Sequence, residues 1–229
     1  MSPSQPLPRG LFVTGTDTGI GKSIASACLL HALRAGGTRA VGMKPVASGC
    51  QASDEGWRNE DALLLQAASS PTPRYQDVNP YALPQPLAPE IAAAEAGVEI
   101  SLDIIVQAHA RLAALAETVV VEGVGGWAAP ISAGLDQIDL VRALRLPVVL
   151  VVGLRLGAIN HARLSVRAIQ ADGAELVGWI ANGIDPHMER SDENFEILRK
   201  RLPVPCWGRL PYAEQPDPAA LAARVKPVF

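Results

Sequence analysis

The stretch Gly15–Ser23, GTDTGIGKS, decides the fold. It follows a short apolar run, Leu11–Thr14, and opens the segment Lys22–Ala35, whose apolar residues recur at helical spacing. A strand, a glycine-rich loop and a helix that begins at Gly-Lys-Ser form a phosphate-binding loop, because backbone N–H groups and the helix N-terminus then face the anion. The strict pattern has glycine six residues before the lysine, where this chain has Thr16. A glycine-rich turn with an ordinary surface lysine therefore remains an alternative.

Further strands and helices are predicted to alternate along the rest of the chain. Continuous apolar runs predict strands at 40–44, 118–122, 147–152, 176–181 and 204–210. Helical segments are predicted at 61–68, 101–117 (with Ser101 as N-cap), 136–145, 158–172 and 194–202. Apolar runs without alternation are typical of parallel strands that are covered on both faces. We therefore expect an α/β fold, a single doubly wound and mostly parallel sheet flanked by helices, like that of P-loop NTPases.

The remaining segments are predicted to be irregular. Residues 1–9 carry three prolines and are expected to form a loose N-terminal arm. Cys50–Asn59 is polar and predicts a loop, and Pro71–Pro89 holds six prolines and predicts mostly irregular structure. No internal repeat or linker divides the sequence, so we expect one domain over residues 1–229.

Composition excludes several classes of protein. Twenty Lys and Arg against 23 Asp and Glu give a net charge of −3, and aromatic residues make up 4%, which argues against a nucleic-acid-binding surface. The three cysteines form no Cys-x-x-Cys pair, which argues against a zinc ribbon. The longest apolar run, Leu146–Leu154, is far shorter than a membrane span, and no secretory signal is visible. We therefore expect a cytoplasmic protein, with neither nucleic acid nor membrane as a partner.

Polar residues follow the predicted strands, at the edge where parallel sheets bind ligands. Glu122 ends an apolar strand beside the phosphate loop and suits a magnesium ligand, although it could instead cap the glycine turn after it. Lys44 ends the second strand and points toward the ligand edge, unless it extends to solvent. Ser48 follows in a turn that could offer a hydroxyl to an anion. Asp61 at a helix start is by itself more simply explained as a cap.

A series of motifs matches a known family. In order, the chain contains GTDTGIGKS, MKPVASG, NEDAL, VNPY, VEGVGGW, LPVVLVVGLRLGAINH and GWIANG, between Leu11 and Tyr212. These motifs resemble those of dethiobiotin synthetases. The departures are mild: Ser23 replaces the usual Thr, and Val124 replaces a frequent Ala. Since a serine hydroxyl binds magnesium as a threonine hydroxyl does, the resemblance is not weakened.

The resemblance implies a reaction and its partners. One amine of 7,8-diaminopelargonic acid is carboxylated by CO2, and the resulting carbamate attacks the γ-phosphate of ATP. The second amine then closes a cyclic urea, which gives dethiobiotin, ADP and phosphate in biotin biosynthesis. Mg2+ is the implied cofactor. A homodimer with shared active sites is the implied assembly.

The resemblance also implies roles for individual residues. Lys22, Lys44 and Thr18 would be catalytic, and Ser23, Asp61 and Glu122 would bind the metal. ATP would be bound by Thr16, Asp17, Gly19, Ile20, Gly21, Lys22, Ser23, Asn182, Pro211 and Glu214. The substrate would be bound by Ser48 and, through the neighbouring subunit, by Gly157, Ala158, Ile159 and Asn160. On spacing alone, Asn160 could instead cap the helix that begins there.

Two other classes share the phosphate loop. A ParA/MinD-like switch ATPase usually has an extra lysine early in that loop, and GTDTGIGKS has none. A P-loop small-molecule kinase is expected to carry an arginine-rich lid, and the sequence shows no such cluster. Both remain alternatives at this point, with the switch ATPase the nearer one.

Overall fold

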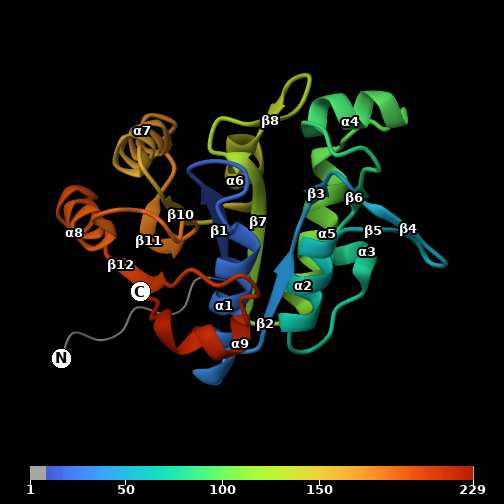
Figure 1. Cartoon of the computed structure of the whole chain (residues 1–229). Coiled ribbons are helices and arrows are strands. Elements are labelled where there is room, and N and C mark those ends of the chain that lie inside the picture. The colour runs from blue at the N-terminus through green and yellow to red at the C-terminus, as the bar shows by residue number, and fades with distance from the viewer. Residues whose placement is uncertain (1–8, 229) are drawn as a thin grey trace.

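The computed structural model describes residues 9–228. Its centre is a six-stranded sheet in the order β12-β11-β10-β1-β7-β2, in which all neighbours are parallel (Figure 1). The strands are β1 Gly10–Gly15, β2 Ala40–Met43, β7 Thr118–Gly126, β10 Val148–Leu154, β11 Leu176–Gly183 and β12 Cys206–Leu210. The predicted doubly wound parallel α/β sheet is confirmed. The predicted arm lies outside the described residues, apart from Arg9.

Helices cover both faces of this sheet (Figure 1). Leu11 and Val13 of β1 pack into one core and Phe12 into the other, because successive side chains of a strand point to opposite faces. The first core includes α1 Lys22–Ala35 and α2 Glu60–Ala68. The second includes α5 Leu102–Leu115, α6 Gln137–Leu144, α7 Ala158–Ala171 and α8 Ser191–Arg201. Two apolar cores explain the uninterrupted apolar runs of the strands.

Several short elements were not predicted. Cys50–Asn59 is not a simple loop, because β4 Gln51–Ser53 and β5 Gly56–Arg58 form an antiparallel hairpin there. The proline-rich segment holds α3 Tyr75–Val78 and β6 Tyr81–Ala82, which pairs with β3 Val46–Ala47, and α4 Pro89–Ala96 follows. A second hairpin joins β8 Pro130–Ser132 to β9 Leu135–Asp136, and α9 Pro218–Leu221 and a 3-10 turn, Ala222–Arg224, are the last helical elements of the described residues.

Two details bear on the expectations above. Ser101 stands at the N-cap of α5, but its side chain makes no capping hydrogen bond there. Within residues 9–228, none of the helices is long and apolar enough to cross a membrane.

Candidate active site

The phosphate-loop motif lies between β1 and α1, as its pattern predicts. Gly19 and Gly21 adopt φ values of 72° and 78°, a left-handed backbone that favours glycine. Gly21 is the N-cap of α1, and no side chain within the described residues caps this helix start. The first N–H groups of α1 are therefore open to an anion, whose charge the helix dipole also favours.

Lys22 begins α1 and is almost completely buried. Its Nζ donates to the Asp17 backbone oxygen at 2.9 Å, which folds the side chain back over the loop. Burial, and then the nearby Lys44 ammonium, lower the pKa of Lys22 to about 8, although carboxylates such as Glu122 oppose this shift. Since an anionic phosphate beside the ammonium would raise the pKa again, phosphate binding favours the charged form of Lys22.

Lys44, Glu122, Ser23 and Asp61 meet in one cluster. Glu122 Oε1 accepts hydrogen bonds from Lys44 Nζ at 2.5 Å and from Ser23 Oγ at 2.8 Å. Lys44 Nζ also lies 3.3 Å from Asp61 Oδ2. The Lys44 side chain is only 6% exposed, so the alternative in which it extends to solvent is wrong. Thus Lys44 bridges the two carboxylates that were predicted to bind a metal.

The charge state of Lys44 follows from these partners. Burial lowers the pKa of Lys44, but the Glu122 and Asp61 carboxylates outweigh it and hold the pKa above the ordinary lysine value. The ammonium therefore stays charged inside the protein.

The cluster fits a magnesium ion. Glu122 is completely buried, yet its Oε2 has no hydrogen-bond partner within residues 9–228. Such an orphaned buried oxygen is costly unless a ligand satisfies it. Magnesium is commonly held by one or two carboxylates, with substrate phosphates and water as the other ligands. Among the described residues, no group of three or more His, Cys, Asp or Glu side chains is positioned to hold a metal by itself.

A cleft of about 1100 Å³ surrounds this cluster. It is lined by Lys22, Ser23, Lys44, Asp61 and Glu122, together with Thr18, Gly19, Gly21 and Ser48 among the predicted residues. A smaller cavity of about 230 Å³ lies on the other side of the loop and shares Gly19, Gly21 and Ile24 with the cleft. Asn182 and Pro211 line this smaller cavity. The phosphate loop therefore lies between two cavities, and a nucleotide bound across the loop would enter both.

Four predicted nucleotide-binding residues line neither cavity. Asp17 pairs with Arg155 at 2.5 Å, and the Thr18 N–H and Arg155 hold the pKa of the Asp17 carboxyl below its usual value. Ile20 is buried, and its backbone oxygen accepts a hydrogen bond from Asn182 Nδ2 at 2.9 Å. Thr16 and Glu214 do not line the cavities either.

The turn at the start of α7 also lies outside both cavities. Gly157 is the N-cap, with a φ of 93°, and no side chain of the described chain caps this helix. The alternative in which Asn160 is the cap is wrong, because Asn160 lies within the first turn of α7. Gly157 and Asn160 are exposed, Ile159 is half-buried and Ala158 is buried.

Sequence reasoning missed the residues that hold the site in place. Gln137 is fully buried; it accepts from the Val124 N–H at 2.9 Å and donates to the Gly126 and Trp127 carbonyls, which fixes the glycine turn after Glu122. Asn59 and Asn79 contact the Ser48 and Lys44 backbones. Both asparagines fall in motifs quoted above, NEDAL and VNPY, but a motif alone does not show what its asparagine contacts.

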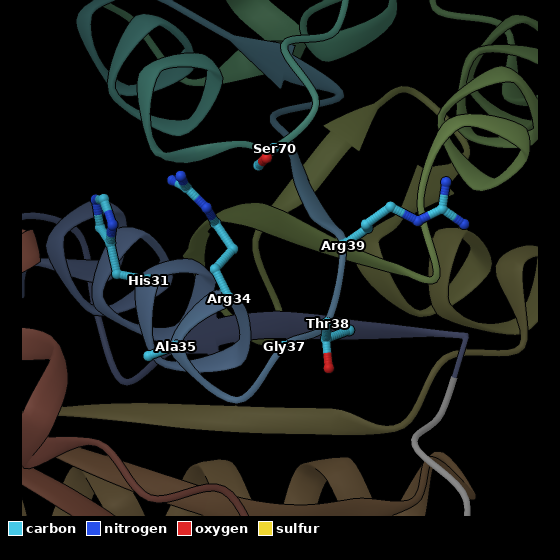
Figure 2. Close-up of a pocket in the computed structure, with 7 residues that line it drawn as sticks. All are labelled: His31, Arg34, Ala35, Gly37, Thr38, Arg39 and Ser70. Carbon is cyan, nitrogen blue, oxygen red and sulfur yellow. The ribbon is translucent and has the colours of Figure 1, made fainter.

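A separate cavity of about 470 Å³ lies at the opposite edge of the sheet, before β2 (Figure 2). His31, Arg34 and Arg39 line it, and Figure 2 shows the two guanidinium groups pointing apart. Arg34 donates to the Ala68 carbonyl and Arg39 pairs with Glu117, while burial and Arg34 lower the pKa of His31. None of the predicted site residues lines this cavity.

Structural similarity supports the fold. The chain resembles a chloroplast FtsY from Physcomitrella patens, with a TM-score of 0.54 and 16% identity over 99% of this chain and 64% of that one. It also resembles a chain of the MinC:MinD complex of Aquifex aeolicus, with a TM-score of 0.52 and 14% identity over 96% and 87%. At such identities the likeness concerns the fold alone, so it does not favour a switch ATPase.

Sequence similarity is far more specific. A family model described as an AAA domain matches residues 9–220. A protein of Xanthomonas oryzae named ATP-dependent dethiobiotin synthetase BioD is 66% identical, over 94% of this chain and 96% of the relative. A protein of Xylella fastidiosa with the same name is 64% identical over the same shares. The chain therefore belongs to the dethiobiotin synthetase family.

Proposed function

We propose that this chain is an ATP-dependent dethiobiotin synthetase, which carboxylates 7,8-diaminopelargonic acid with CO2 and closes the ring. The observation that carries the proposal is the position of Lys44. Its charged Nζ lies 2.5 Å from Glu122, in the same cleft as Lys22 and the phosphate loop. The cleft thus places two ammonium groups, and a carboxylate pair suited to a metal, where two anions, a carbamate and a triphosphate, must approach each other.

The reaction proceeds in three steps. An amine nitrogen of the diamine adds to CO2 and loses a proton, which gives a carbamate. A carbamate oxygen attacks the γ-phosphorus, and the bond to the β-phosphate oxygen breaks to release ADP. The second amine then attacks the carbamate carbon, the bond to the phosphate oxygen breaks, and the cyclic urea, phosphate and a proton are formed.

The residues of the cleft suit these steps by position and charge. The open N–H groups of α1 and the Lys22 ammonium would hold the phosphates. Lys44 would lie between the carbamate and the γ-phosphate and reduce their repulsion. The Thr18 and Ser48 hydroxyls line the same cleft and would orient the diamine or its carbamate. The carbamate is already an anion, so the site needs no base to activate it.

Ser23, Asp61 and Glu122 would hold Mg2+, which when bound neutralises phosphate charge and favours departure of ADP. Lys44 Nζ contacts both the Asp61 and the Glu122 carboxylate. A metal held by these carboxylates would take over that contact and leave Lys44 to face the substrates. The nucleotide base and ribose would lie in the smaller cavity with Asn182 and Pro211.

The experiment that tests this function is phosphate release from ATP with the diamine and bicarbonate supplied or omitted. We expect release to require both.

We further propose a cytoplasmic location, with which the unpaired state of Cys28, Cys50 and Cys206 is consistent. A single domain is also part of the proposal.

We also propose that the enzyme is a homodimer with shared active sites. The turn at Gly157–Asn160 offers uncapped N–H groups that suit a carboxylate, yet it does not line the cleft of its own chain. Leu156, next to it, is 90% exposed and would be covered by the neighbouring subunit in such a dimer. The turn would therefore bind the carboxylate tail of the diamine in the neighbouring subunit.

Mixing two inactive variants tests this arrangement. Lys44→Gln removes the cation from one half of the site, and Gly157→Pro disrupts the turn in the other half, since proline cannot adopt the φ of 93°. In a mixed dimer one site receives both intact halves, so partial activity should return. Full inactivity of mixed dimers that are shown to form would place the diamine site within one chain.

A further inference from the structure

Three residues proposed for the cleft stand on separate segments of the chain. Lys44 directly follows β2, Ser48 follows β3, and Asp61 lies in the first turn of α2. None of these segments is paired with the phosphate loop in the sheet. A single run of buried hydrogen bonds nevertheless joins them, and Tyr75 at the start of α3 stands at its centre.

One arm of this network holds the backbone of Lys44. The Lys44 N–H donates to the Val78 carbonyl at 2.7 Å, and Asn79 Nδ2 donates to the Lys44 carbonyl at 2.7 Å. Asn79 is only 3% exposed, and its Oδ1 accepts from the Tyr75 hydroxyl at 3.0 Å. The Tyr75 hydroxyl therefore fixes the side chain that fixes Lys44.

The other arm holds Ser48 and Asp61. The Tyr75 hydroxyl accepts from the Asn59 N–H at 2.8 Å. Asn59 Nδ2 donates to the Ser48 carbonyl at 3.3 Å, and Asn59 Oδ1 accepts from the Ala62 N–H, which caps α2. Asp61 lies in the first turn of the helix that Asn59 caps. The position of Asp61 thus depends on Asn59, and that of Asn59 on Tyr75.

We propose that Tyr75 is a positioning residue, whose hydroxyl sets Lys44 and Asp61 in register for the metal and the reacting anions. This positioning role rests on the proposed function of the cleft. The hydroxyl donates to one arm and accepts from the other, so this one atom joins the two arms. The Tyr75 ring is 7% exposed and carries the Arg58 guanidinium 4.2 Å above its centre, which restrains it further.

The test is Tyr75→Phe, which removes only the hydroxyl. Tyr81→Phe is the matched control, because Tyr81 is also 7% exposed and its hydroxyl accepts from the Ser101 N–H in a part-buried hydrogen bond outside the network. Tyr81 contacts the network only through its backbone carbonyl, which accepts from Asn79 Nδ2 and which the substitution leaves in place. Each variant leaves an N–H without its acceptor, and Tyr75→Phe also leaves Asn79 Oδ1 without its donor. Both should therefore lose stability, with Tyr75→Phe losing somewhat more.

Only Tyr75→Phe should change the site. The loss of such an outer partner typically costs about 10-fold to 100-fold in metal affinity or activity. We expect that fall in kcat for diamine-dependent phosphate release, with a parallel rise in the Mg2+ needed for half-maximal nucleotide binding. Nucleotide affinity without metal should stay unchanged, since the phosphate loop lies outside the network. Hydrogen exchange at Asn59 should accelerate in Tyr75→Phe alone.

Two results would overturn the positioning role. In the first, Tyr75→Phe matches Tyr81→Phe in kcat and in Mg2+ dependence. In the second, metal-free nucleotide binding falls in parallel with activity, which would indicate a general loss of structure. If the unaltered protein shows no diamine-dependent turnover, the proposed function fails. The Mg2+ titration and hydrogen exchange then decide the role of Tyr75 independently.

Discussion

Lys44→Gln is expected to lower kcat for diamine-dependent phosphate release by about 10²-fold to 10³-fold, the usual loss for one preorganised donor at a developing charge. The ammonium is buried and held charged by Glu122 and Asp61, so glutamine removes a full positive charge from the point where, in our proposal, carbamate and phosphate would meet. The Mg2+ needed for nucleotide binding should not rise, because the carboxylates remain. Phosphate release in a coupled assay measures the first effect, and nucleotide titration measures the second.

The stability of this variant must be measured as well. Removal of one partner from a buried ion pair typically costs about 3–5 kcal/mol, and here it leaves the Glu122 carboxylate with Ser23 as its one hydrogen-bond partner among residues 9–228. Turnover should therefore be divided by the concentration of folded protein, which thermal unfolding followed by circular dichroism gives. Lys200→Gln, at an exposed lysine in the last turn of α8, is the control that should leave both quantities unchanged. Near-normal turnover in folded Lys44→Gln would contradict the role of Lys44.

Glu122→Gln should have the second large effect. The change is nearly isosteric, but it replaces a carboxylate whose Oε2 has no partner within residues 9–228. As a direct ligand, Glu122 should matter at least as much as an outer partner, so we expect turnover to fall by about 100-fold or more. The Mg2+ concentration for half-maximal nucleotide binding should also rise. This rise distinguishes the variant from Lys44→Gln.

The control for this variant is Glu117→Gln. Glu117 is exposed and pairs with Arg39 at the opposite edge of the sheet, so its loss should affect neither turnover nor metal dependence. An Mg2+ titration of Glu122→Gln that superimposes on that of the unaltered protein would remove Glu122 from the metal site.

The central fold was predictable because a buried parallel strand carries its signal in its own residues. Runs such as Val119–Val121 are apolar without interruption, since both faces of the sheet are covered. The hairpin of β4 and β5 carries no such signal, because its residues are mostly exposed and bury no face. Helix α3 and strand β6 could not be predicted, because they are short, lie among prolines and depend on contacts with β2 and β3.

The charged part of the site was predictable for a different reason. Parallel strands place their carboxyl ends at one edge, so Lys44 and Glu122 had to lie near the phosphate loop. Asp61 could not be assigned from spacing, since an acid at a helix start has a simpler explanation, and the family resemblance supplied it. The network around Tyr75 could not be predicted at all. Its hydrogen bonds join residues up to 35 positions apart, and no local pattern encodes them.

The most direct test of the whole account is phosphate release from ATP and Mg2+, measured with and without 7,8-diaminopelargonic acid and bicarbonate, with the organic product identified by mass spectrometry. We predict that release requires both additions and that one cyclic urea forms for each phosphate released. Release that continues without the diamine would instead indicate a switch ATPase. A phosphate group retained on the organic product would indicate a kinase, and either result would contradict the proposed ring closure.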